Sequence, residues 1–183
     1  MDLNNIPDDL RQAVDFHGHL CPGILIGWRA VRAANRELDL KPSRDEELVA
    51  VVENDSCSVD AFQSLLSTTF GKGNLKWLDH GKQVFTVIDR QAGRAVRLSF
   101  IGDAKKRLKP DGSTDREAYM DELLNAPQEE LFEVREVPPE PPREAQIEPS
   151  IKCPRCGEPT QKSKMTLVAG QSLCRPCAAE VSQ

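Results

Sequence analysis

The chain has 183 residues, of which 39% are hydrophobic and 29% charged, a composition typical of folded globular proteins that excludes a fibrous or wholly disordered chain. Its formal net charge of −5 argues against nucleic acid as a partner, and its apolar runs are too short to span a bilayer. The N-terminal residues lack the basic and apolar segments of a secretory leader, so we expect a cytoplasmic protein with no membrane partner.

Helix and strand patterns fill the first 137 residues. In chain order they predict a short helix opened by Pro7, a longer helix from Pro22 to Leu38, a strand at 47–53, a helix at 59–66, strands at 75–78, 83–89 and 95–101, and a helix at 114–124 capped by Thr114 and Glu117. This grouping predicts an α+β fold, with helices packed on an antiparallel or mixed sheet. The small residues Gly27, Ala30 and Ala34 predict that the long helix packs closely on a neighbour.

A proline-rich segment marks the end of this predicted domain. Five prolines fall within the twelve residues 138–149, a composition typical of a semi-rigid linker. We therefore divide the chain into a core domain at 1–137, a linker at 138–150 and a tail at 151–183. The tail carries a formal charge of +3 before thiolates and metal are counted, too little to predict a nucleic-acid surface.

Two Cys-x-x-Cys pairs dominate the tail. Cys153 pairs with Cys156 and Cys174 with Cys177, and seventeen residues separate the pairs. This spacing is typical of a structural zinc site with four thiolate ligands. A predicted hairpin between the pairs and a helix after them complete a pattern that resembles a treble-clef zinc finger. A redox function is the alternative interpretation, but the tail lacks the strand–helix–strand context of a thioredoxin-like motif.

A second group of potential metal ligands occupies residues 16–23, where His17, His19 and Cys21 stand at alternate positions. An extended backbone would project these three side chains to one side. Cys57, like Cys21, stands where a predicted helix begins, a position that lowers thiol pKa values. The four residues predict a core site for zinc, iron or copper. The alternative, in which the histidines are satisfied by loop hydrogen bonds and the cysteines are buried and inert, stays open.

Two charged residues are further candidates for the core site. Asp60 lies one turn into the helix after Cys57, where it can orient a ligating histidine or simply cap the helix. Lys72, in the glycine-rich segment 71–74, is a candidate for binding a small anionic substrate. The third histidine, His80, is interpreted as a surface residue.

Residues 16–23, 57–63 and 71–74 resemble motifs of the formylmethanofuran dehydrogenase FmdE family. This family is named after operons that encode a molybdenum or tungsten enzyme of methanogens, and some members carry a C-terminal treble-clef zinc finger. The resemblance implies an α+β core that dimerises and an active site around His17, His19, Cys21 and Cys57.

We therefore expect an FmdE-like metal-binding protein of one-carbon, formylmethanofuran-type redox metabolism. The expected cofactors are a structural zinc in the tail and a second transition metal in the core, and the expected partners are a second copy of the chain and a larger enzyme complex. An enzyme with metal or thiol chemistry and an accessory component of a molybdenum or tungsten formylmethanofuran dehydrogenase both remain open. The candidate catalytic residues are His17, His19, Cys21, Cys57, Asp60 and Lys72. The alternative function is a metal-responsive regulator or assembly factor whose zinc finger binds protein or nucleic acid.

Overall fold

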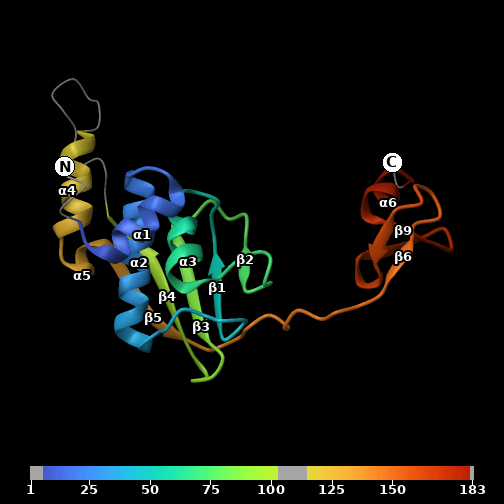
Figure 1. Cartoon of the computed structure of the whole chain (residues 1–183), viewed down its shortest axis with the longest axis horizontal. Helices are drawn as coiled ribbons and strands as arrows, with labels where there is room; N and C mark the ends of the chain where they lie inside the picture. Colours follow the sequence, from blue (N-terminus) through green and yellow to red (C-terminus); the bar gives the residue numbers. More distant parts are fainter. Residues whose placement is uncertain (1–5, 103–114, 182–183) are drawn as a thin grey trace. The chain divides into compact units, whose positions relative to one another are not determined.

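The computed structural model describes residues 6–102 and 115–181, which form two compact units divided between Glu144 and Ala145 (Figure 1). This division lies inside the proline-rich segment 138–150. Thr114, which was predicted to cap a helix, lies outside the described residues. None of the helices within the described ranges is both long and apolar enough to cross a membrane.

The larger unit combines helices with one five-stranded sheet. Its elements are α1 (Asp8–His17), α2 (Pro22–Leu38), β1 (Leu48–Val52), α3 (Ser58–Leu66), β2 (Leu75–Trp77), β3 (Val84–Asp89), β4 (Arg94–Phe100), α4 (Arg116–Asn125), α5 (Gln128–Leu131) and β5 (Phe132–Val137). The strand order is β2-β1-β3-β4-β5, with β1 and β2 parallel and the other neighbours antiparallel. The predicted α+β class is therefore confirmed, whereas α5 and β5 were missed.

Helices α1, α2 and α3 lie on one face of the sheet (Figure 1), where alternate strand residues join them in the main apolar core. Phe62 of α3 stacks on Phe85 of β3 with ring centroids 4.7 Å apart, which fixes α3 over the centre of the sheet. The opposite face of the sheet carries a smaller apolar cluster of Val49, Ile88 and Ala95. The main core therefore lies between the helices and the sheet, and it anchors the loops that carry the candidate site.

The first turn of α3 packs directly on α2. A Cβ atom added to Gly27 would lie 2.1 Å from the carbonyl oxygen of Ser58, and one added to Gly23 would lie 2.8 Å from the Cβ atom of Cys57. These two glycines, one helical turn apart, leave room for the backbone of Ser58 and for the side chain of Cys57, where any larger residue would collide. The close packing predicted from the small residues around Gly27 is present, and it brings Cys57 to the N-terminus of α2.

The smaller unit contains two antiparallel strand pairs and a short helix over its described residues. Its elements are β6 (Ser150–Lys152), β7 (Pro159–Gln161), the 3-10 helix η3 (Lys162–Lys164), β8 (Met165–Val168), β9 (Gln171–Cys174) and α6 (Arg175–Val181). Three cysteines make up most of its buried apolar cluster, together with Leu173 and Ala178. An apolar core of this size cannot stabilise a fold by itself, so the unit needs a cross-link or a bound metal.

Candidate metal centres

Four cysteine sulfurs converge in the smaller unit. The Sγ atoms of Cys153, Cys156, Cys174 and Cys177 all lie within 4.8 Å of one another. The Cys156 and Cys174 sulfurs are 3.8 Å apart, and the backbone N–H of Cys174 donates to the Cys153 sulfur at 3.4 Å. Gly157, with a φ of +77°, provides the turn that lets the first pair face one point. The cluster fits the predicted zinc finger and can hold a metal such as zinc.

The pKa values of these thiols point to the same requirement for a cation. Backbone hydrogen bonds, first from Cys156 and then from Cys174, lower the pKa of Cys153 to about 6. In contrast, the neighbouring thiol of Cys174 and then burial raise the pKa of Cys177 to about 12. Cys177 can therefore be a thiolate at neutral pH only when a bound cation compensates its charge.

In the larger unit, a sharp reversal of the chain between α1 and α2 places two of the predicted ligands close together. His17 is the last residue of α1, and Gly18 ends this helix in the left-handed conformation with a φ of +94°. Cys21 is the N-cap of α2, followed directly by Pro22, and its sulfur accepts a hydrogen bond from the backbone N–H of Ile24 at 3.4 Å. As a result the Nε2 atom of His17 lies 3.7 Å from the Cys21 sulfur.

Cys57 completes a group of three donor atoms. The ligating atoms of His17, Cys21 and Cys57 all lie within 4.8 Å of one another, with Cys21 buried and the other two partly buried. Cys57 reaches this position because it directly precedes α3, which rests on Gly23 and Gly27. Three protein donors leave one position of a tetrahedral metal site free for a further ligand.

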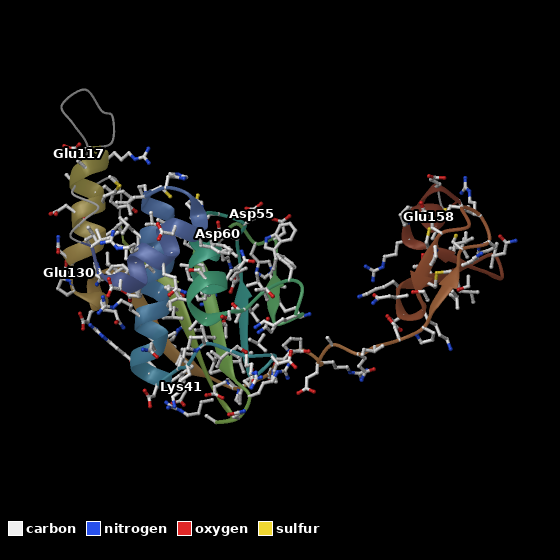
Figure 2. The ribbon with its side chains drawn as sticks, in the orientation of Figure 1. Lys41, Asp55, Asp60, Glu117, Glu130 and Glu158 are labelled. Carbon is white, nitrogen blue, oxygen red and sulfur yellow. The ribbon has the colours of Figure 1, made fainter. Side chains whose placement is uncertain are left out.

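Asp60 fixes the orientation of the imidazole of His17. The Nδ1 atom of His17 lies 2.7 Å from Oδ2 of Asp60, and the other carboxylate oxygen accepts a hydrogen bond from Nε2 of Gln63 at 3.1 Å. Figure 2 labels Asp60 at the start of α3. A proton on Nδ1, donated to Asp60, leaves the lone pair of Nε2 directed toward the two sulfurs. Of the two roles predicted for Asp60, the geometry matches the orienting one.

The pKa of Cys57 differs from the prediction for a thiol at a helix start. Burial, followed by the neighbouring Cys21, raises the pKa of the Cys57 thiol above its ordinary value. These two effects outweigh a backbone hydrogen bond that lowers it, so the lower pKa expected at a helix start is not found. Cys57 therefore needs a cation close by before it is a thiolate at neutral pH.

Two other residues predicted to belong to the core site lie outside this group. The imidazole of the exposed His19 packs beside that of His17, with ring centroids 4.6 Å apart, but offers no donor atom to the group. The Nζ atom of Lys72 donates to the carbonyl oxygen of Ser43 at 2.9 Å. Ser43 precedes β1 and Cys57 follows it, so Lys72 lies at the opposite end of this strand from the donor group.

His80, interpreted from the sequence as a surface residue, also interacts with the buried Glu53. Its Nδ1 atom lies 3.1 Å from one carboxylate oxygen of Glu53, and Arg97 donates to the other at 2.9 Å. Burial alone would raise the pKa of Glu53, but the hydrogen bonds from His80 and Arg97 outweigh it, and the pKa is lowered. This ion cluster fixes the beginning of the loop that leads from β1 to Cys57. A carboxylate directly after a buried strand was the available signal in the sequence.

Comparison with known proteins places this chain in a family. Residues 16–133 match the family model described as FmdE, Molybdenum formylmethanofuran dehydrogenase operon. The chain is 27% identical over 195 aligned residues to a probable S-adenosyl-L-methionine-binding protein of Archaeoglobus fulgidus, and the alignment covers 92% of this chain and 52% of that protein. The chain thus spans about half the length of this relative.

A solved structure shares the fold over nearly the whole chain. It is the crystal structure of a tungsten formylmethanofuran dehydrogenase FmdE-like protein from Syntrophus aciditrophicus. The TM-score is 0.68 at 24% sequence identity, over 95% of this chain and 92% of that one. Because the family model also matches more than half of the sequence, from the end of α1 to the edge strand β5, the chain belongs to the FmdE family.

Proposed function

We propose that the larger unit binds one transition-metal ion through His17, Cys21 and Cys57 and presents the open coordination position to a formyl or related one-carbon compound. The observation that carries this proposal is the convergence of three donor atoms within 4.8 Å of one another. Membership of the FmdE family supports the link to one-carbon redox metabolism of the formylmethanofuran type.

The donor set suits zinc or a related borderline-soft cation. Two thiolates and a neutral imidazole are typical ligands of such ions, and a cation held there polarises a carbonyl or a bound water at the open position. Asp60 keeps the proton of His17 on Nδ1, so Nε2 stays available as a ligand. We assign proton transfer at the open position to His19, because its exposed imidazole lies beside that of His17.

Metal analysis of the purified full chain tests this proposal. We expect two equivalents of transition metal per wild-type chain, because the two donor groups lie in different units. The double variant Cys21→Ala, Cys57→Ala should retain only the metal of the smaller unit, since a single imidazole cannot hold an ion at the core site. Unchanged tryptophan fluorescence would show that the variant is folded. A wild-type chain with a single equivalent, or a double variant with two, would contradict the proposed site.

We further propose that the chain is a homodimer and serves as an accessory component of a larger enzyme complex. The larger unit exposes several large apolar side chains, namely Phe16, Phe70, Trp77, Leu78 and Ile101. In the smaller unit Leu167 is 75% exposed. Exposed apolar side chains in this number favour contact with a partner. We expect the predicted zinc finger at 151–183, called the finger below, to pack against the second copy or to bridge both copies.

Light scattering tests both parts of the dimer proposal. The full chain should have twice the mass of one chain, and removal of residues 145–183 should weaken dimerisation because the finger contact is lost. A cut after Glu144 keeps Pro142, whose carbonyl oxygen accepts a hydrogen bond from Arg90 at 2.7 Å. A monomeric full chain would refute the dimer, and unchanged dimerisation of the shortened chain would refute the role of the finger.

A metal-responsive regulator or assembly factor is the second candidate. The exposure of His19 beside the donor group favours it, because a site that senses or transfers an ion must exchange that ion with its surroundings. Rapid loss of the core metal to a chelator, with no binding of formyl compounds, would support this candidate over the first. We place either function in the cytoplasm, where a reducing environment keeps ligand thiols free.

A further inference from the structure

A network of polar side chains surrounds the loop that carries Cys57. Asn54, only 6% exposed, donates from Nδ2 to the carbonyl oxygen of Lys82 at 2.8 Å, which ties the loop to the residues before β3. Its Oδ1 atom accepts from the backbone N–H of Ser56 at 3.2 Å and from the Ser56 hydroxyl at 2.8 Å. The Ser58 hydroxyl, which is fully buried, lies 3.2 Å from the same oxygen.

Gln83, the residue before β3, completes the network. Its Nε2 atom donates to the hydroxyl oxygen of Ser56 at 2.9 Å, and its Oε1 atom lies 3.1 Å from the hydroxyl of Ser58. The two serine oxygens are themselves 2.8 Å apart. Ser56 and Ser58, the neighbours of Cys57 in the chain, are therefore held by hydrogen bonds to Asn54 and Gln83.

Cys57 takes no part in this network. Its side chain makes no capping hydrogen bond to α3, whereas the sulfur of Cys21 caps α2 by accepting from Ile24. On its other side, the Cβ atom of Cys57 rests against Gly23 of α2. The hydrogen bonds of the network fix the loop without using the sulfur of Cys57, which therefore remains available as a metal ligand.

We infer that Asn54, Ser56, Ser58 and Gln83 act together as positioning residues that hold the Cys57 sulfur at bonding distance from the core metal. This inference rests on the metal site proposed above. A thiolate bond to zinc has a length of about 2.3 Å with little tolerance, so loss of the supporting hydrogen bonds moves the sulfur out of range. Partners that orient metal ligands typically contribute about 10–100-fold to metal affinity.

Cobalt binding to the full chain tests the inference, because thiolate-bound Co²⁺ has intense absorption bands that report its ligands. The core signal is the difference between the spectra of the wild-type chain and of the Cys21→Ser, Cys57→Ser variant, in which only the finger binds cobalt. We expect Asn54→Ala to weaken core cobalt binding about tenfold or more and to shift its bands.

Asn74→Ala is the matched control. Asn74 is fully buried and uses its side-chain amide to bind the carbonyl oxygens of Asp45 and Leu48 at 3.0 and 2.9 Å, at the opposite end of β1. This variant should lower the melting temperature as Asn54→Ala does, but leave core cobalt affinity within about twofold, because distant sites act independently.

A conservative pair of variants adds a second readout. Ser56→Ala removes the hydroxyl that joins Asn54 to Gln83 and should weaken core cobalt binding, whereas Ser56→Thr keeps a hydroxyl and should restore the wild-type bands. Equal cobalt affinity in Asn54→Ala and wild type, or equal losses in Asn54→Ala and Asn74→Ala, would overturn the inference. A wild-type chain without a core signal would instead refute the proposed metal site, and the inference would fall with it.

Discussion

Replacing Cys156 with serine should unfold the smaller unit and leave the larger unit folded. The apolar cluster of the smaller unit is small, so the four-cysteine site must supply most of its folding free energy, on the order of 10 kcal/mol or more when zinc binds. A serine hydroxyl is a poor zinc ligand at neutral pH, and three remaining sulfurs bind the ion too weakly to offset the chain entropy. The substitution should therefore unfold the finger completely rather than destabilise it slightly.

Amide NMR spectra measure this effect, since resonances of residues 145–181 should lose their dispersion in Cys156→Ser. Both tryptophans, Trp28 and Trp77, lie in the larger unit, so their fluorescence should stay at the wild-type value. Cys156→His is the matched control, because an imidazole can replace one thiolate in a structural zinc site. It should restore the dispersed spectrum. A dispersed finger spectrum in Cys156→Ser after chelation would show that no metal is needed.

The finger could be predicted almost completely from the sequence because its determinants are local. Two cysteine pairs, the glycine after the first pair and a short hairpin all fall within about 30 consecutive residues, and the metal requires the same geometry in any chain. The core donor group was harder to predict, since Cys57 is far in sequence from His17 and Cys21. Its position at the start of a helix was the local signal, and the packing of α3 on Gly23 and Gly27 completes the site.

Lys72 lies apart from the donor group for a topological reason. Cys57 precedes α3 and Lys72 follows it, and α3 connects the parallel strands β1 and β2. A helix in such a crossover runs antiparallel to the two strands, so the loops before and after it lie at opposite ends of these strands. The glycine-rich sequence around Lys72 does not indicate at which end of the strands this loop lies. The parallel pairing of β1 with β2 determines it.

His19 shows the limit of a spacing argument. Alternate positions share a face only in extended backbone, but His17 is helical and Gly18 turns the chain in the left-handed conformation. The ring of His19 therefore packs on that of His17 instead of joining the donor group. The polar network around Cys57 escaped the sequence analysis for a different reason. Gln83, just before β3, comes close to Ser56 in the loop after β1 only because β1 pairs with β3.

Gly27→Ala should lower the free energy of unfolding of the larger unit by about 2 kcal/mol or more, which is the sum of two opposing effects. Alanine has a higher helix propensity than glycine by about 1 kcal/mol, so α2 alone would gain stability. The added Cβ atom, however, would lie 2.1 Å from the carbonyl oxygen of Ser58, which no side-chain rotation can relieve. Overpacking typically costs about 1–3 kcal/mol, and a collision with backbone belongs at the upper end or above it.

Urea unfolding followed by tryptophan fluorescence measures this loss in the larger unit alone, because the smaller unit contains no aromatic residue. Gly71→Ala is the matched control, since a Cβ atom at Gly71 would meet no atom within 4 Å. Its stability should stay near that of wild type. Gly27→Ala should also weaken core metal binding, because displacement of Ser58 moves the adjoining Cys57. A Gly27→Ala chain at least as stable as wild type would mean that α2 and α3 do not pack as closely as described.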